Sequence, residues 1–149
     1  MIRLWPVIHV RDVATTVQNA RVAQACGAWG VFLIHMAGDD ALLDPMAQKV
    51  REACSGLLVG LNYLSLDAET ALGRALAQGH DATWTDRPGV HSNGVEPGAL
   101  AMSQQLQTHP DHTLFALVAF KYQPFEPDPG DAAATAWSLG FVPTTSGIA

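Results

Sequence analysis

Polar side chains that could bind a ligand or transfer a proton follow apolar, strand-like segments along this 149-residue chain. They recur about once per ~25 residues, the length of one βα unit in a parallel-sheet protein. In α/β folds, ligands bind and reactions occur at the carboxyl ends of the strands. The first candidates for a functional site are therefore His9, His35, Asn62, Asp86, Lys121 and the segment 144–147.

Lys121 follows a run of apolar residues, which predicts a position at the rim of a ligand site. A lysine there could form a Schiff base with a carbonyl substrate, or hold a phosphate or carboxylate. Alternatively, its aliphatic stem lies along the surface and its ammonium group pairs with Glu126 or Asp128. The sequence leaves these three interpretations open.

His9, His35, Asp39 and Asp40 follow the first two strand-like segments and could meet at one edge of a sheet. Imidazole and carboxylate groups are ligand types for zinc. They are also general acids and bases, or they hold a structure together through hydrogen bonds. Because the spacing matches no metal-binding motif, we assign no metal ligand.

Three further features complete the candidate site. Asn62 stands alone in an apolar segment, so its amide needs partners if it is buried. The segment 86–98 is polar and glycine-rich, which is typical of a lid or binding loop, or of plain surface. The hydroxyl-rich segment 144–147 could bind an anion through its backbone N–H groups. We expect catalytic roles for His35, Asp86 and Lys121, and substrate-binding roles for His9, Asp39, Asn62, Arg87, His91, Asn93, Thr145 and Ser146.

These residues are positioned by six predicted strands that alternate with five predicted helices. Asp12 and Asp67 are the predicted N-caps of the first and third helices. Such alternation requires parallel pairing and right-handed crossovers. No GxGxxG motif opens the first helix, which favours a (β/α)8 barrel over a doubly wound sheet. The strands are expected at 7–10, 30–35, 57–64, 82–85, 113–121 and 141–144, and the helices at 13–26, 41–53, 68–78, 99–107 and 131–139.

A barrel of this type has eight strands, whereas the sixth predicted strand lies at the end of this sequence. We therefore expect a single TIM-barrel-like α/β domain over 1–149 with six βα units, C-terminally incomplete or open. An open sheet has two exposed edges. A homo-oligomer is expected to cover them.

The composition is that of a compact globular domain, with 48% hydrophobic and 15% charged residues. A net charge of −6 and the lack of a basic cluster argue against nucleic-acid binding. No apolar run reaches the ~18 residues of a spanning helix, and no signal peptide is evident. We expect a cytoplasmic protein that binds a small molecule, without membrane insertion; the cofactor is unknown.

Several other residues are expected to serve the fold. The two cysteines have no partner spacing and are predicted to be small buried apolar residues. Three histidines are predicted to be solvated, and three tryptophans to fill the layer between strands and helices. The cysteines are Cys26 and Cys54, the histidines are His80, His109 and His112, and the tryptophans are Trp29, Trp84 and Trp137.

Six segments in order along the chain also suggest a family. They are VIHV, GAWGVFLIHMAGDD, GLLVGLNYLSLDAETALGRALAQGHDATW, GVHSNGVEPG, LFALVAFKY and DPGDAAATAWSLGFVPTTSG. Together they resemble the BtpA family, TIM-barrel proteins named for a member implicated in photosystem I biogenesis. The chain departs from that family's pattern after His9, at His35 in place of Asn, and at Tyr122 after Lys121 in place of His.

The resemblance implies a BtpA-like barrel with a site for a small polar or phosphorylated metabolite at the strand C-termini. As an enzyme, it would carry out acid/base chemistry or a lyase-type change at a carbon–carbon or carbon–nitrogen bond. The alternative that the resemblance implies is a non-catalytic assembly or stabilising factor of the BtpA type.

Overall fold

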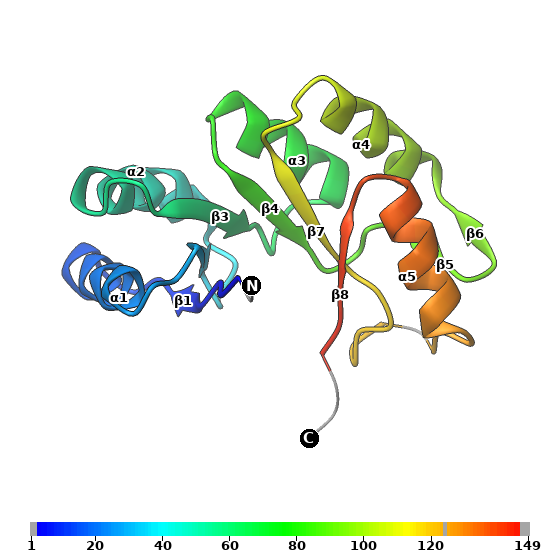
Figure 1. Cartoon of the computed structure of the whole chain (residues 1–149), viewed down its shortest axis with the longest axis horizontal. Coiled ribbons are helices and arrows are strands. Elements are labelled where there is room, and N and C mark those ends of the chain that lie inside the picture. Colours follow the sequence, from blue (N-terminus) through cyan, green and yellow to red (C-terminus); the bar gives the residue numbers. More distant parts are fainter. Residues whose placement is uncertain (1–2, 124, 147–149) are drawn as a thin grey trace.

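The computed structural model describes residues 3–123 and 125–146, in which six parallel strands form one sheet (Figure 1). Each strand pairs with the next one of the sheet along the chain, so the order never reverses. All five pairings are parallel. The strands are β1 (Val7–His9), β2 (Gly30–Ile34), β3 (Leu58–Asn62), β4 (Ala82–Thr85), β7 (Thr113–Leu117) and β8 (Val142–Thr144).

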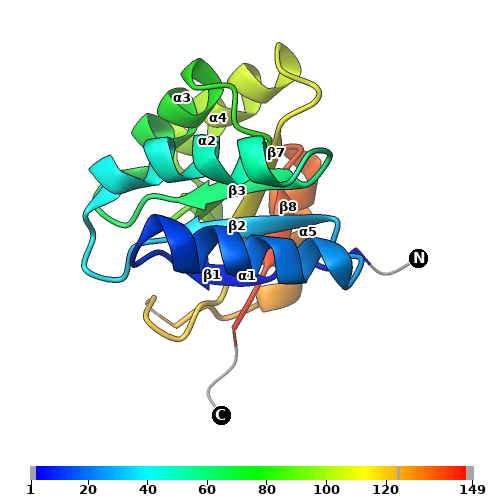
Figure 2. The same cartoon turned by 90° about the vertical axis from the view of Figure 1, so that its left-hand side faces the viewer.

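The helices all cover one face of this sheet. Figure 1 shows them along the outer side of a curved sheet, and Figure 2 shows α1 and α2 side by side in front of β1 to β3. A doubly wound sheet would carry helices on both faces and reverse its strand order. The predicted parallel α/β sheet is confirmed, with the one-sided arrangement of a barrel wall. The helices are α1 (Val13–Ala25), α2 (Leu43–Ala53), α3 (Ala68–Ala77), α4 (Pro97–Gln107) and α5 (Pro129–Ser138).

Helix starts follow the predicted capping residues. The side chain of Asp12 accepts a hydrogen bond from the Thr15 N–H at 2.8 Å, and that of Asp67 accepts one from the Thr70 N–H at 2.9 Å. Helix α2 begins two residues later than predicted, because a 3-10 turn (Asp40–Leu42) precedes it.

The predicted strand 113–121 is four residues too long. The last paired residues of β7 and β8 are Leu117 and Thr144. Beyond this pair, the Val118 N–H donates to the Thr144 carbonyl at 2.9 Å. Ala119 then adopts a left-handed conformation with φ of 53°, which an extended strand cannot contain. Lys121 therefore lies in the turn beyond the strand and not at its end.

The segment 86–98 is partly ordered into a hairpin, which the sequence analysis missed. Strands β5 (Val90–His91) and β6 (Gly94–Val95) pair antiparallel across a two-residue turn. The buried carboxylate of Glu126 accepts hydrogen bonds from the backbone and the hydroxyl of Ser92 in that turn. These bonds attach the hairpin to the segment that leads into α5.

The two faces of the sheet have different cores. The helix side is aliphatic, and two clusters centred on residues such as Leu33, Leu61 and Leu114 fill it. The concave side is aromatic: the Phe32 ring lies 5.2 Å from those of Trp5 and Trp84 and 5.0 Å from that of Phe115, between centroids.

Three predicted core positions are wrong. Trp29, between α1 and β2, is 43% exposed, and Trp137, in α5, is 69% exposed, so neither ring is enclosed between strands and helices. Cys26 is exposed at the C-cap of α1, whereas Cys54 is buried as predicted. Trp84 does contribute to a core, but on the concave side of the sheet.

The aromatic cluster depends on Gly60, in the middle of β3. A Cβ atom at this position would overlap the Phe32 ring. We expect Gly60→Ala to lower the free energy of unfolding by about 1–3 kcal/mol, the usual cost of overpacking a filled core. Urea unfolding followed by circular dichroism measures this. Gly73→Ala, in α3 and with open space around it, is the matched control; an equal effect of both substitutions would contradict the packing argument.

Within residues 3–123 and 125–146, β1 and β8 each pair along one edge only. The expected homo-oligomer that would cover these edges stays a prediction, which light scattering can check. None of the helices in the described part of the chain is long and apolar enough to cross a membrane.

Candidate functional site

A cavity of about 460 Å³ opens on the concave side of the sheet, at the carboxyl ends of β2, β3, β4 and β7. Its walls are mainly apolar and include Phe32, Trp84 and Leu117. Four of the predicted site residues line it, and these are Asn62, Asp86, Lys121 and Ser146. The spacing of polar residues after strands therefore located a cavity, as the parallel topology requires.

Asn62 and Asp86 form a hydrogen-bonded pair in this cavity. Asn62 is buried at the end of β3, and its Nδ2 donates to Asp86 Oδ1 at 3.2 Å. This bond meets the need for a partner that an amide in an apolar strand creates. Asp86 directly follows β4 and is half-buried. The backbone carbonyl of Asp86 also accepts from the Gln123 side chain, which ties the β7–α5 segment to the site.

Lys121 and Ser146 approach the same cavity from the other side. The turn after Ala119 brings Lys121 to the rim, where its Nζ lies 5.1 Å from the centroid of the exposed Tyr122 ring. The alternative pairing with Glu126 or Asp128 is not formed. Ser146 follows β8, and Gly147 of the predicted anion-binding segment lies outside the described residues.

The other candidates from the first two strands do not line this cavity. His9 borders a separate apolar groove between β1 and α1. His35 Nδ1 accepts a hydrogen bond from the Asp39 N–H at 3.0 Å, so this pair stabilises its own turn. The buried Asp40 carboxylate accepts from the backbone of Leu64 and Ser65 and so fixes the loop after β3.

The candidates from the hairpin lie next to the main cavity. Arg87 and His91 line an adjoining polar cavity of about 400 Å³, together with Glu96 and Glu126. Tyr122 borders both cavities. Asn93 is exposed in the hairpin turn, and the Thr145 hydroxyl donates to the Ala119 carbonyl at 3.4 Å. Arg87 and His91 therefore line a cavity next to the main one, whereas Asn93 and Thr145 line neither cavity.

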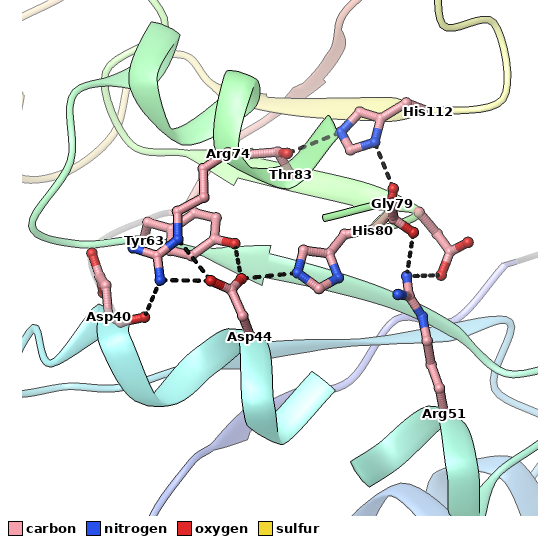
Figure 3. Close-up of polar contacts among 10 residues, drawn as sticks. Asp40, Asp44, Arg51, Tyr63, Arg74, Gly79, His80, Thr83 and His112 are labelled. Carbon is pink, nitrogen blue, oxygen red and sulfur yellow. Dashed lines mark hydrogen bonds and ion pairs between the residues drawn. The ribbon is translucent and has the colours of Figure 1, made fainter. Parts of the chain in front are cut away.

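A second polar cluster, on the helix side of the sheet, was missed by the sequence analysis (Figure 3). Asp44 of α2 is at its centre and accepts from the Tyr63 hydroxyl at 2.5 Å and from His80 Nε2 at 2.9 Å. Arg74 Nε of α3 donates to Asp44 at 2.7 Å, and Arg74 Nη2 forms an ion pair with the same carboxylate at 2.5 Å. This cluster, which we call the Asp44 network, joins α2, β3, α3 and the start of β4.

The electrostatics of the Asp44 network favour one protonation state. Burial opposes ionisation of Asp44, but the bonds from Tyr63, His80 and Arg74 outweigh it and hold the pKa of this carboxyl below its usual value. Burial, with a contribution from Asp44, raises the pKa of the Tyr63 hydroxyl. Asp44 is therefore a carboxylate that accepts bonds from neutral Tyr63 and cationic Arg74.

His80 and His112 are not solvated, which corrects the prediction. His80 is buried under the Asp44 network, and His112 bonds to the His80 carbonyl at 2.8 Å and to the Thr83 hydroxyl at 2.9 Å. Burial is the main cause that lowers the pKa of both imidazoles below 6.5. A histidine in a turn can still be covered by the next βα unit, and no local pattern reports this.

The lowered pKa values predict loss of stability in mild acid. The unfolded chain binds protons at these histidines near pH 6.5, whereas the folded chain resists them until a lower pH. Their contribution is complete above pH 6.5 and is lost as the pH falls towards the folded-state pKa. We expect the free energy of unfolding to drop by about 1–2 kcal/mol between pH 8 and pH 5. Urea unfolding at both pH values measures this.

His112→Asn, which removes one titrating group, should reduce this pH dependence. Equal or greater stability of the original chain at pH 5 would contradict the account of the two histidines.

Comparison with known proteins identifies the fold but not the activity. The fold is that of a parallel α/β protein with a cavity at the carboxyl ends of its strands. No protein-family profile and no curated protein sequence matches the chain. Solved structures do match, 27 chains in all.

Three of these structures illustrate the similarity. A mandelate racemase/muconate lactonizing protein from Herpetosiphon aurantiacus has a TM-score of 0.61 at 11% identity, over 99% of this chain and 46% of its own. The mandelate racemase/muconate lactonizing enzyme from Roseiflexus sp. has a TM-score of 0.59 at 14% identity. The match covers 99% of this chain and 48% of that enzyme. A dipeptide epimerase from Methylococcus capsulatus, complexed with Mg ion, has a TM-score of 0.59 at 14% identity. The match covers 97% of this chain and 47% of the epimerase. The chain thus spans less than half the length of these proteins.

The resemblance to the BtpA family is therefore wrong. The three similar structures named here are mandelate racemase/muconate lactonizing proteins and an epimerase, and no protein-family profile matches the chain. The BtpA-like function and its non-catalytic alternative are not supported either. The motifs that suggested the family are apolar strands followed by one polar residue, and any parallel βα repeat produces such segments.

The magnesium ion of the similar epimerase prompts a test of the donor set here. Among the residues that the structure describes, no three His, Cys, Asp or Glu side chains gather so as to hold a metal ion. The cavity offers one carboxylate, Asp86, and the amide of Asn62. These residues do not fit a dedicated divalent-cation site.

Proposed function

We propose that this chain belongs to an enzyme that transfers protons on a small molecule bound in the concave cavity. Asp86 is the general acid–base in this proposal. The observation that carries it is the Asp86 carboxylate, held by the buried Asn62 at the carboxyl edge of a parallel sheet, facing a cavity with apolar walls.

The geometry of the pair supports this role. The Asn62 amide bonds to Asp86 Oδ1, which leaves Oδ2 to take a proton from a bound molecule or to return one. Apolar walls of Phe32, Trp84 and Leu117 exclude water and strengthen electrostatic interactions with the substrate. The ammonium group of Lys121 at the rim supplies the opposite charge.

The fold comparison supports the same class of reaction. Racemisation and epimerisation, the activities in the names of the similar structures, invert a carbon centre by removing a proton and returning one. One positioned carboxylate can perform either half of such an exchange. We also propose that the six βα units are part of the wall of a (β/α)8 barrel, with this cavity at its mouth.

Exchange of substrate protons with deuterium tests the proposal. The chain is incubated in D2O with a panel of small chiral amino acids, hydroxy acids and dipeptides, and loss of each C–H signal is followed by proton NMR. We expect at least one compound to exchange faster than in the chain-free control. A panel in which no compound exchanges above that control would contradict the proposed proton transfer.

A further inference from the structure

Two residues that line the concave cavity, and a third beside it, carry buried polar atoms without hydrogen-bond partners. In the described part of the chain, five buried side-chain polar atoms have no hydrogen-bond partner, and three of them belong to Trp84, Thr144 and Ser146. Trp84 and Ser146 line the cavity, and Thr144 lies in register with the cavity residue Leu117, on the same face of the sheet. Because buried polar groups are nearly always paired, unpaired atoms on two residues of one cavity and on a neighbouring residue need an explanation.

The chemistry of these atoms indicates what would pair with them. The indole N–H of Trp84 can only donate, and the hydroxyls of Thr144 and Ser146 can donate. Lys121, at the rim of the same cavity, carries three N–H donors and a positive charge. The carboxylate of Asp86 is the acceptor on the other side, and Asn62 already bonds to it. The cavity therefore offers donors and a cation from Trp84, Ser146 and Lys121, and a proton acceptor from Asp86.

We propose that the cavity binds an oxyanion, a carboxylate or a phosphate group of the ligand, against Trp84 Nε1 and Ser146 Oγ with Lys121 as the countercharge. An ionised oxyanion has only acceptors, and hydrogen bonds to a charged group are the strong ones. The inference rests on the proposed function for the location of the site. It adds the substrate class and its orientation: the anionic end contacts Trp84 and Ser146, and the proton to be transferred faces Asp86.

Binding requires movement of the rim. The three unpaired atoms do not contact solvent, so an oxyanion reaches them only when neighbouring side chains shift. Two side chains that border the cavity, Met36 and Tyr122, are 62% and 77% exposed and are therefore not confined by packing. Rearrangement of side chains at a binding site is common even where the backbone hardly moves.

The indole signals of the full chain provide a direct test. The four tryptophans give four side-chain N–H signals in a proton–nitrogen NMR spectrum, assigned by triple-resonance methods. Sodium acetate and sodium phosphate are the probes, with sodium chloride at matched ionic strength as the reference. We expect the Trp84 signal to move with acetate or phosphate, while those of the exposed Trp29 and Trp137 stay in place. The probe with the higher affinity distinguishes a carboxylate ligand from a phosphate.

Two variants at neighbouring positions test the donor assignment. Ser146→Ala should weaken binding of the better probe by about tenfold, since one hydrogen bond to a charged group is lost. Thr145→Ala removes a hydroxyl outside the cavity and should leave the affinity unchanged. A Trp84 signal that moves with neither probe, or equally with chloride, overturns the proposal. Equal effects of the two variants would overturn the role of Ser146.

A third variant separates this inference from the proposed function. Asp86→Asn should abolish proton exchange but keep or increase the affinity for the probe, because it removes a negative charge from the cavity. Loss of probe binding in this variant would contradict the orientation. Absence of proton exchange in the original chain, with probe binding intact, would contradict the proposed function alone.

Discussion

Asp86→Asn is expected to slow the proton exchange of a substrate by at least about a hundredfold, because an amide cannot accept and return a proton. Its shape is nearly that of the carboxylate, so the fold and the contact with Asn62 should persist. The rate is measured by proton NMR in D2O on the compound with the fastest exchange.

The control for this variant is Asp111→Asn, in the loop between α4 and β7 and outside the cavity. It carries the same change of charge, and its exchange rate should match that of the original chain. A rate within about threefold of the original for Asp86→Asn would remove Asp86 from the reaction, since general acid–base catalysis contributes 10²-fold or more.

Asp44→Ala is expected to lower the free energy of unfolding by about 3 kcal/mol, because it leaves buried donors without their acceptor. Tyr63 and His80 are both more than nine-tenths buried and both donate to Asp44. Arg74 is partly exposed and can turn to water, so its share is smaller. Thermal unfolding measures this as a Tm decrease of about 6–12 °C for a domain of this size.

Glu52→Ala on the same helix is the matched control. Glu52 pairs with Lys49 at 2.8 Å on the open surface of α2, where solvent screens the interaction. Its Tm should stay close to that of the original chain. If both substitutions lowered the Tm equally, the helix itself and not the Asp44 network would be the sensitive feature.

The sequence predicted the fold because its signals are local. Apolar strands, capping residues such as Asp12 and Asp67, and βα spacing together define a parallel sheet with right-handed crossovers. The end of β7 was predicted too late in the chain, because apolar residues continue beyond Leu117 whereas the pairing with β8 stops there. Ala119 leaves the strand without a glycine to mark the turn.

The candidate site was predictable only in part. Asn62 and Asp86 end neighbouring strands, so adjacency in the sheet was enough to bring them together. His35 and Asp39 also follow a strand, but the Asp39 N–H donates to the His35 ring. Their position after a strand does not reveal whether a side chain will bond within its own turn or face the cavity. The Asp44 network joins residues 19 to 36 positions apart, through side chains on the helix side that no spacing rule connects.

The BtpA resemblance shows the limit of short motifs. Apolar strands ending in His, Asn or Lys recur in parallel barrels of many functions, because the same edge of the sheet serves different chemistries. The three-dimensional arrangement of the strands carries more information than those motifs, and it matches proteins at only 11–14% identity.

A crystal structure of Asp86→Asn with the compound that exchanges fastest tests the central claim most directly. We expect the compound to occupy the concave cavity, with its exchanging carbon within about 3.5 Å of residue 86, as proton transfer requires. Its anionic group should lie towards Trp84 and Ser146. A compound bound instead in the groove beside His9, or in the polar cavity of Arg87 and His91, would contradict the assignment of this cavity as the active site.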